Sequence, residues 1–472
     1  MRTIISNDIR IENPTQDLRI WCENNLVFRN PEYDQLMRRG KETVIKYKRI
    51  PEKIYLYYYD KNILVLPFGC LNAVRERIER NSDKIYQSFN KDAQISFSGA
   101  KAQSIDSFYD YQEDAINAAI KAKGGVIVAN CGAGKTYVGM ELIRRIGKRA
   151  LWLCHTGDLL RQAKDDLLKL YPTAKIGLTT EGCLNIGEDI TIATVQTMSK
   201  IDPFLYKDKF NVVICDECAH VCGHPTKLQM FASVISKIPA RYKYGLTATP
   251  TRADGLINAM YAYIGTNPNG TFSPTYKVDR ERVKTMEAEH VRVDLDYEFS
   301  FRDQMQILDS SGMIDYNALV SFLCEKRERN EIIVDNIVKC ANEGRKQIVL
   351  SLRVGHCKHL VEMLKERGIN AVLCVGDTSA KNREKILKQE VEWDVLVATY
   401  SLLKEGVSIK ELDTLHLCSP AKEKGMIVQC AGRIERYLEN KKQPIIYDYV
   451  DVAIPYCENA YKKRKSALKR RF

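Results

Sequence analysis

Six consecutive residues have the types and the order that bind a phosphate chain: Cys131, Gly132, Ala133, Gly134, Lys135 and Thr136. Glycines let backbone N–H groups wrap around phosphate oxygens, and a helix that starts here adds the positive end of its dipole. Lys135 would reach the β and γ phosphates, and the Thr136 hydroxyl would bind Mg²⁺. Because an apolar segment precedes the loop and a helical segment follows it, the spacing predicts a site for ATP and Mg²⁺.

Two carboxylates that could complete such a site, Asp216 and Glu217, follow the apolar segment 211–215. Asp216 would hold Mg²⁺ directly or through water, and Glu217 would act as a general base that polarises the attacking water. An acidic turn that only ends a strand is the alternative interpretation. The position of the pair after the phosphate loop favours hydrolysis of a nucleotide.

Cysteine and histidine are frequent in the same stretch, at Cys215, Cys218, His220, Cys222 and His224. Such a density could indicate zinc, which binds thiolate and imidazole groups tetrahedrally. Cys215 belongs to the apolar strand, however, and a strand of this kind places the side chain in the core. We therefore favour nucleotide chemistry here and keep a zinc site as the weaker alternative.

These candidate residues follow short apolar segments that alternate with helical ones, which is typical of a parallel sheet with helices on both faces. The alternation stops at a Gly- and Pro-containing stretch, 265–274, and then resumes. The sequence therefore predicts an α/β protein with two successive parallel sheets. The expected strands are 126–130, 150–155, 190–195, 211–217 and 244–249 in the first sheet, and 347–352, 371–376, 395–400, 414–419 and 444–450 in the second.

The first 104 residues are a candidate module of their own, rich in tyrosine and basic residues. Strands are expected at 54–60 and 63–69. Aromatic and basic side chains together can bind nucleic acid, but they also fit a half-buried sheet with solvated helices. The residues concerned are Arg38, Arg39, Lys41, Tyr55, Tyr57, Tyr58 and Tyr59.

The length of 472 residues favours two or three domains. Lys and Arg (72) exceed Asp and Glu (60), and the net charge of +12 favours polyanionic partners. No run approaches the ~20 apolar residues of a membrane span, and the N-terminal segment lacks the apolar core of a signal peptide. The 15 scattered cysteines suit buried thiols in a reducing compartment, so we expect a cytoplasmic protein without membrane contact.

The order of these motifs resembles that of the superfamily 2 helicases of the DExH-box type over about residues 105–455. The resemblance implies two tandem RecA-like domains behind a small α+β module, and an enzyme that hydrolyses ATP. The segments that carry it are Tyr111-Gln112, the phosphate loop, the Asp-Glu-Cys-Ala-His segment 216–220, the Leu-Thr-Ala-Thr-Pro segment 246–250, and the Gln-Cys-Ala-Gly-Arg-Ile-Glu-Arg segment 429–436.

The resemblance also implies roles for residues outside the phosphate loop. Arginine can stabilise the charge that spreads over the γ phosphate in the transition state, because its guanidinium is planar and always charged. The residues expected to contact nucleotide or act in its hydrolysis are Gln112, Glu405, Gly406, Gln429, Arg433 and Arg436. Those expected to couple nucleotide state to nucleic acid are His220, Thr247 and Thr249. Those expected to contact the sugar-phosphate backbone are Gln162, Thr194, Gln196, Arg353, Gly376 and Thr399.

Within the superfamily, the chain looks most like the phage-type recombination helicases and the excision-repair helicases of xeroderma pigmentosum group B. This similarity implies an N-terminal DNA-binding module (1–104), an ATP-binding RecA-like domain (105–270) and a second RecA-like domain (271–472). We expect an ATP-dependent DNA helicase or translocase that acts on duplex, forked or branched DNA in repair or recombination. An RNA helicase, and an ATP-gated DNA clamp or recruitment scaffold, are the alternatives.

The same similarity suggests a monomer, or a weakly self-associating protein, in the cytoplasm of a bacterial or phage-infected cell, associated with the nucleoid while it is bound to DNA. A basic cluster near the C-terminus, 462–471, could add contacts to phosphates without sequence preference. Such a cluster can also be the solvated end of a helix.

Overall fold

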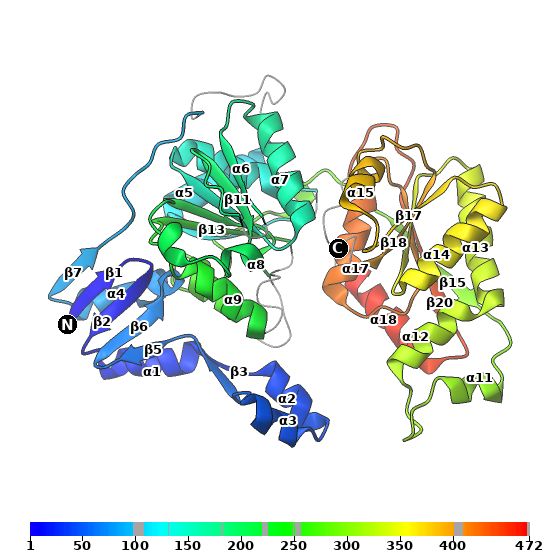
Figure 1. Cartoon of the computed structure of the whole chain (residues 1–472), viewed down its shortest axis with the longest axis horizontal. Coiled ribbons are helices and arrows are strands. Elements are labelled where there is room, and N and C mark those ends of the chain that lie inside the picture. The colour runs from blue at the N-terminus through cyan, green and yellow to red at the C-terminus, as the bar shows by residue number, and fades with distance from the viewer. Residues whose placement is uncertain are drawn as a thin grey trace. The chain divides into compact units, whose positions relative to one another are not determined.

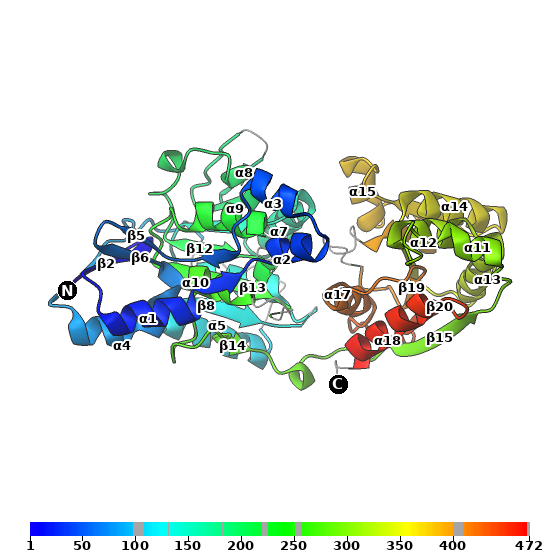
Figure 2. The same ribbon diagram turned by 90° about the horizontal axis from the view of Figure 1, so that it is seen from below.

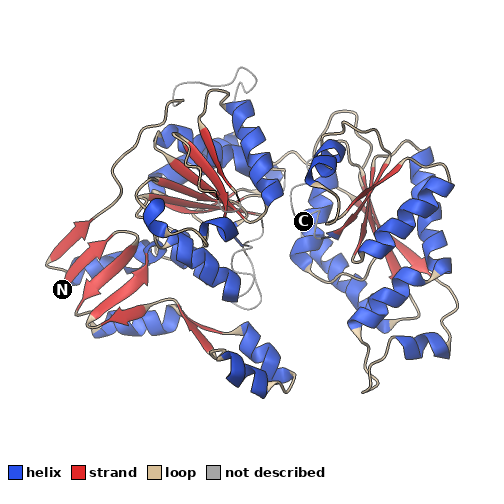
Figure 3. Ribbon diagram, in the orientation of Figure 1, coloured by secondary structure: helices blue, strands red, loops and turns tan. Residues whose placement is uncertain are grey.

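The computed structural model describes residues 1–97, 108–130, 132–180, 183–219, 225–248, 250, 256–400 and 409–469. The chain forms two compact units, Met1–Val283 and Lys284–Phe472 (Figure 1). Each unit contains a parallel sheet with helices on both faces, as the alternation of apolar and helical segments predicts (Figure 3). Within the described residues, no helix is both long and apolar enough to cross a lipid bilayer.

Seven strands form the main sheet of the first unit, in the order β10-β11-β9-β12-β13-β8-β14, and all of them are parallel. The C-terminal ends of the strands therefore lie along one edge. The strand β14 pairs with β8 beyond the predicted boundary at residue 270, which is why the first unit extends to Val283. The bounds are Gly124–Val128 (β8), Ala150–Cys154 (β9), Ile176–Thr179 (β10), Ile190–Thr194 (β11), Val212–Cys215 (β12), Tyr242–Thr247 (β13) and Tyr276–Lys277 (β14).

Successive residues of these strands face opposite sides of the sheet, so each side has its own core. In β8, Ile127 belongs to one buried cluster, whereas Val126 and Val128 belong to the other. The first cluster includes side chains of α5 (Asp110–Ala122), α6 (Lys135–Ile146) and α7 (Gly157–Leu170). The second includes side chains of α8 (Val195–Met198), α9 (Pro225–Ile235) and α10 (Ile257–Ile264).

The N-terminal module is an α+β unit with a mixed sheet in the order β5-β6-β2-β1-β7. A separate two-stranded ribbon, β3 with β4, leads to the helices α2 and α3 (Figure 1). The single strand predicted at 54–60 is therefore wrong, because the buried Leu56 turns the chain between β4 and β5. The bounds are Arg2–Ile5 (β1), Asp8–Glu12 (β2), Gln16–Asn25 (α1), Val27–Arg29 (β3), Pro31–Arg38 (α2), Glu42–Lys48 (α3), Lys53–Tyr55 (β4), Tyr58–Asp60 (β5), Ile63–Pro67 (β6), Leu71–Asn81 (α4) and Lys84–Gln87 (β7).

The N-terminal module packs directly on the α9 and α10 side of the first parallel sheet, and both contribute to one apolar cluster. The backbone of Gly69 lies against α10, and Thr266 N donates to Gly69 O at 2.9 Å. A Cβ atom on Gly69 would lie 2.5 Å from the carbonyl oxygens of Tyr261 and Ala262. Only glycine permits this approach. The module and the first parallel sheet belong to one compact unit, Met1–Val283, and the domain boundary expected at residue 104 stays a prediction.

Polar side chains fasten the chain between β7 and the first sheet. Asn90 Nδ2 donates to Lys207 O at 2.7 Å and to Phe210 O at 2.8 Å. Ser96 N and Oγ both donate to the buried carboxylate of Asp189, at 2.6 and 2.7 Å. These hydrogen bonds hold the connecting segment along the sheet rather than leaving it as a free linker.

Six parallel strands form the sheet of the second unit, in the order β15-β20-β19-β16-β18-β17. Helices α17 and α18 lie side by side and contribute to the core on one face, while α13 and α14 contribute to the other (Figures 1 and 2). The strand bounds are Glu289–Leu295 (β15), Gln347–Ser351 (β16), Ala371–Cys374 (β17), Val395–Thr399 (β18), Thr414–Leu417 (β19) and Ile445–Asp451 (β20). The helix bounds are Phe301–Gln306 (α11), Tyr316–Glu325 (α12), Arg327–Asn342 (α13), Val354–Glu366 (α14), Ala380–Leu387 (α15), Lys424–Ile434 (α17) and Pro455–Lys469 (α18).

Two buried ion pairs join helices of the second unit to β20. Arg329 Nε of α13 lies 2.7 Å from Asp451 Oδ1, with side-chain exposures of 0% and 2%. Arg464 Nη2 of α18 lies 2.6 Å from Asp448 Oδ1, and both side chains are equally buried. Arg464 belongs to the basic C-terminal cluster, so the suggestion that this cluster contacts phosphates is wrong for that residue, because its guanidinium is already neutralised inside the core.

Candidate active site

The phosphate loop connects the end of β8 to the start of α6. Gly132 and Gly134 have φ angles of 86° and 75°, a left-handed conformation that side chains with a Cβ rarely adopt. The left-handed conformation explains why glycines occur at both positions. It also directs the loop toward the first turn of α6, where Lys135 and Thr136 begin the helix. Cys131 lies outside the described residues.

Gln112 on α5 holds the phosphate loop in place. Its Nε2 donates to Ala133 O at 3.0 Å, and its Oε1 accepts from Tyr109 N at 3.1 Å. A Cβ on Gly134 would lie 2.3 Å from Gln112 Nε2, so the glycine also makes room for this amide. The structure thus gives Gln112 a positioning role for the loop, and contact with adenine stays a prediction.

The acidic pair follows β12 at the same edge of the sheet, with only β13 between β12 and β8. Lys135 Nζ lies 3.5 Å from Glu217 Oε1, so the structure brings the predicted phosphate-binding lysine and general base together. Glu217 has a φ of 47°, which is an uncommon conformation for a residue with a side chain. Its backbone N–H donates to Asp216 Oδ1 at 3.0 Å, and this bond helps to fix the position of the Asp216 carboxylate.

Burial raises the pKa of Asp216 to about 7, and the nearby Glu217 carboxylate adds to the increase while Lys135 opposes it. A buried carboxylate beside a second one is unfavourable in its charged form, and a divalent cation would relieve this cost. Thr136 and Asp216 offer the hard oxygen ligands that Mg²⁺ prefers. The donors therefore fit the predicted Mg²⁺ site, and the ion would neutralise phosphate charge there.

The other residues predicted on the first sheet follow neighbouring strands at the same edge. Thr194, at the end of β11, accepts a hydrogen bond from Thr197 N, and Gln196 Nε2 donates to His155 O at 3.0 Å. Thr247 ends β13, and its carbonyl accepts from Ala129 N at 3.0 Å, directly before the phosphate loop. Gln162 lies on α7. His220 and Thr249 are outside the described residues.

The residues predicted on the second sheet also gather at its C-terminal edge. Thr399 at the end of β18 pairs with Ser351 at the end of β16, and Gly376 follows β17. Arg353 is the N-cap residue of α14, and its Nη2 donates to Asn317 Oδ1 at 3.0 Å. Glu405 and Gly406 lie outside the described residues.

Gln429, Gly432 and Arg433 lie on α17, and Arg436 follows the end of that helix. Lys441 Nζ donates to the carbonyl of Arg436 at 2.8 Å, and burial lowers the pKa of Lys441 to about 8. This bond fixes the backbone at the helix end. The role of the two arginines in the transition state stays a prediction.

Of the residues that suggested zinc, His220, Cys222 and His224 lie outside the described residues, so the zinc alternative stays a hypothesis. Cys215 and Cys218 are buried, and Cys218 Sγ lies 3.2 Å from Met260 Sδ in the apolar core. No group of three His, Cys, Asp or Glu side chains gathers as a metal site in the described part of the chain.

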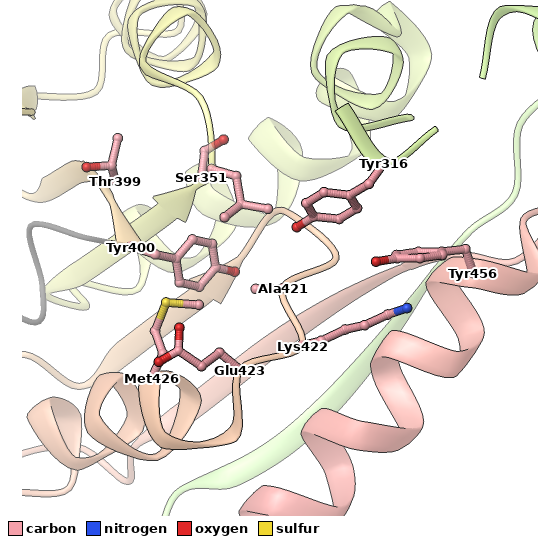
Figure 4. A pocket seen from close by; sticks show the side chains of 10 residues that line it. Tyr316, Ser351, Thr399, Tyr400, Ala421, Lys422, Glu423, Met426 and Tyr456 are labelled. Carbon is pink, nitrogen blue, oxygen red and sulfur yellow. The ribbon is translucent and has the colours of Figure 1, made fainter. Parts of the chain in front are cut away.

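Sequence reasoning missed three residues at the edge of the second sheet: Tyr316, Lys422 and Tyr456. They line a cavity together with Ser351 and Thr399 (Figure 4). The available signal was weak, because the three residues are far apart in the sequence and none of them directly follows a strand.

Two family models match the chain. The model described as the res subunit of type III restriction enzymes matches residues 106–252, and the helicase conserved C-terminal domain matches residues 328–437. Together with the motif order and the relatives below, these matches show that the chain belongs to the superfamily 2 helicases.

Curated relatives share about a quarter of the aligned residues. An ATP-dependent RNA helicase of Acanthamoeba polyphaga mimivirus is 25% identical over 70% of this chain, but the match spans only 60% of that protein. The ATP-dependent DNA helicase UvsW of Enterobacteria phage T4 is 24% identical over 75% of this chain and 70% of its own. The DNA 3'-5' translocase XPB2 of Sulfurisphaera tokodaii is 25% identical over 72% and 81%. The expected similarity to phage-type and group B helicases is therefore confirmed.

Among solved structures, that of S. cerevisiae Dbp5 bound to RNA and ADP BeF3 is similar, with a TM-score of 0.58 and 13% identity over 78% of this chain and 89% of that one. Identity this low shows the fold alone. The predicted fold class, two RecA-like domains behind a small α+β module, is confirmed.

Proposed function

We propose that this protein hydrolyses ATP to move along a strand of DNA, and that it thereby unwinds or remodels duplex, forked or branched DNA. The observation that carries the proposal is the 3.5 Å approach of Lys135 Nζ to Glu217 Oε1, beside the buried Asp216. Phosphoryl transfer depends mainly on positioning and electrostatics, and these three groups supply both.

Each side chain has a distinct task in this proposal. Lys135 binds the β and γ phosphates, Thr136 and Asp216 hold Mg²⁺, and Glu217 orients the attacking water and receives its proton. Arg433 and Arg436 stabilise the charge on the γ phosphate from the second unit. Repeated closing and opening of the two units then moves the strand contacts.

The strand path in this proposal follows the same sheet edges as the nucleotide chemistry. Thr194 and Gln196 in the first unit, and Arg353, Gly376 and Thr399 in the second, contact sugar and phosphate groups. Contacts of this kind carry little sequence information and weaken as salt is raised. The net charge of +12 supports a polyanionic substrate of this type.

DNA is the preferred substrate in the proposal because two relatives are named as a DNA helicase and a DNA translocase. RNA is the second candidate, since the mimivirus relative is named as an RNA helicase. The test compares ATP hydrolysis with no nucleic acid, single-stranded DNA, forked DNA, duplex DNA and RNA. We expect the greatest stimulation by DNA, whereas greater stimulation by RNA would overturn the choice of substrate.

A clamp or scaffold that does not hydrolyse ATP is the remaining alternative. Comparing ATP turnover by the wild type and Glu217→Gln on DNA separates the two. Equal, negligible turnover by both proteins would support the clamp and remove the catalytic assignment.

A further inference from the structure

A cavity of about 450 Å³ opens at the C-terminal edge of the second sheet (Figure 4). Ligands of parallel α/β sheets bind at this edge, outside the carboxyl ends of the strands. The volume lies within the range that holds small organic ligands. The lining residues that carry the argument are Tyr316, Ser351, Thr399, Lys422, Glu423 and Tyr456.

The walls of the cavity are held by the buried ion pairs of this unit. Arg329 Nη2 donates to Cys418 O at 2.8 Å, and Arg464 Nη1 donates to Ala421 O at 3.2 Å. Both acceptors belong to the loop between β19 and α17, which carries Lys422. The loop is therefore preorganised, and ordering it on ligand binding costs little.

Two tyrosine rings and one ammonium group occupy the outer side of the cavity. The rings of Tyr316 and Tyr456 lie 5.6 Å apart with a tilt of 40°, and Lys422 Nζ lies 3.1 Å from the centroid of the Tyr456 ring. Figure 4 shows the hydroxyl groups of both tyrosines directed toward the middle of the cavity. The side chain of Tyr316 remains 39% exposed, so its ring is accessible to a ligand.

The polar groups of these three side chains are available for binding. Among the described residues, none of them forms a hydrogen bond or ion pair with the protein. Burial raises the pKa of both phenols, so they stay protonated and can donate. Burial also lowers the pKa of Lys422, which reflects an ammonium partly stripped of water and in need of an anionic partner.

This combination selects one class of ligand. Aromatic rings stack on nucleobases, hydroxyl groups donate to phosphate or sugar oxygens, and an ammonium neutralises a phosphate. The described lining does not favour a metal ion, because Glu423 is the single carboxylate among the described residues that line the cavity. A paired base does not fit either, since a base enters such a cavity only when it is unstacked from its neighbours.

We propose that Tyr316, Tyr456 and Lys422 form a subsite that holds one unstacked nucleotide of a single strand bound along the edge of the second sheet. The inference rests on the proposed function. It adds residues outside the recognised motifs to the strand path of the second unit, beyond Arg353, Gly376 and Thr399.

The test uses the full chain and a labelled oligothymidylate of about 12 nucleotides, a length typical of single-strand sites. Tyr316→Leu should raise the Kd about 5- to 100-fold, since stacking of one base contributes about 1–3 kcal/mol. Tyr316→Phe keeps the ring and should lose less affinity. Phe301→Leu is the matched control, because Phe301 is 77% exposed in the same unit and does not line the cavity.

Lys422→Gln gives a second and independent readout. Loss of one phosphate contact should reduce the slope of log Kd against log salt concentration by about 0.7 for a single strand. A merely structural lysine would change affinity without changing this slope. An unchanged slope would therefore overturn the phosphate contact.

Two outcomes would overturn the subsite as a whole. Tyr316→Leu could bind oligothymidylate as tightly as Phe301→Leu does, or it could lose equal affinity for single-stranded and fully paired DNA. Equal losses with oligothymidylate and oligouridylate would support stacking that ignores the sugar. Failure of the proposed function is a separate result, seen when wild-type ATP hydrolysis responds to no nucleic acid.

Discussion

The two parallel sheets share an architecture but are stabilised in different ways. The first is covered on its α9 and α10 side by the N-terminal module, through apolar packing and the close approach of Gly69. The second is held from within, where Arg329 and Arg464 pair with carboxylates of β20. External packing supports the nucleotide edge, whereas internal ion pairs support the edge of the tyrosine cavity.

The two units also differ in the side chains that lie next to their buried carboxylates. Asp448 and Asp451, two buried carboxylates of β20 in the second unit, each have a guanidinium within hydrogen-bond distance. Asp216 of the first unit instead lies beside another carboxylate, and its raised pKa records the cost. The carboxylate of Asp451 is neutralised by a side chain of the protein itself. The carboxylate of Asp216 would instead be neutralised by a bound ligand, which is common at reactive sites.

The largest expected effect concerns the reactive edge. Glu217→Gln should lower ATP turnover about 10²- to 10⁴-fold, because it removes the proposed general base. Nucleotide binding should remain, since Lys135 and the loop are unchanged. Steady-state turnover and nucleotide titration measure the two effects. Glu188→Gln is the control, because Glu188 is exposed and forms an ion pair with the exposed Lys175, and this variant should hydrolyse ATP normally.

The next largest effect concerns the internal ion pairs. Arg329→Met should destabilise the second unit by about 3–5 kcal/mol, because it leaves Asp451 buried without its partner. Arg327→Met, on the same helix, removes an exposed pair with Glu331 and should cost less than about 1 kcal/mol. Hydrogen exchange resolved to the second unit measures both. Similar losses of protection in the two variants would contradict the contrast between the sheets.

The external packing of the first sheet is tested at Gly69. Gly69→Ala should destabilise the first unit by about 1–3 kcal/mol, since its methyl group would overlap two carbonyl oxygens of α10. Gly355→Ala is the control, because no atom lies within 4 Å of its added Cβ and the residue is helical. Urea unfolding followed in the first unit should show a loss for the first variant only.

The smallest effect is the dependence of the reactive edge on pH. Because the pKa of Asp216 lies at about 7, protons compete with Mg²⁺ below that value, and Mg²⁺ affinity should fall about tenfold per pH unit. The sign for stability is opposite to that of a paired carboxylate. The folded state binds the proton more tightly than the unfolded chain does, so the charged Asp216 costs stability fully above pH 7 and less as the pH falls.

Asp216→Asn should therefore be more stable than the wild type without nucleotide at pH 8, and the difference should shrink toward pH 4. Thermal unfolding of both proteins across this range measures the gap. A constant gap, or a more stable wild type at pH 8, would contradict the assigned environment of Asp216.

Much of the fold could be predicted because the ten expected strands of the parallel sheets are short apolar runs between helical segments. The strands β10, β14 and β15 were not predicted, and in β15 (Glu289–Leu295) polar and apolar residues alternate. The phosphate loop and the acidic pair could also be predicted, since local spacing fixes their chemistry. Long-range packing could not. The residues around Gly69 contain no pattern that predicts its contact with α10. The type of residue at Leu56 likewise does not predict that the run 54–60 is divided between two sheets there.

The same limit explains the basic C-terminal cluster and the tyrosine cavity. Arg464 resembles its basic neighbours in sequence, and only the tertiary placement of Asp448 identifies it as a core residue. Tyr316 and Tyr456 come from different helices, α12 and α18, and their rings meet because side chains of both helices share one buried cluster. A local sequence motif does not predict contacts with residues that are far away in the sequence.

The shared apolar cluster between the N-terminal module and α10 has a practical consequence for dissection of the protein. Removal of the module by cutting the chain near residue 104 would expose the apolar side chains of α10 to solvent. The truncated protein is therefore expected to aggregate, and its behaviour would not show what the module does. Substitutions of exposed residues of the module, which leave its contact with α10 intact, are the better way to determine its role.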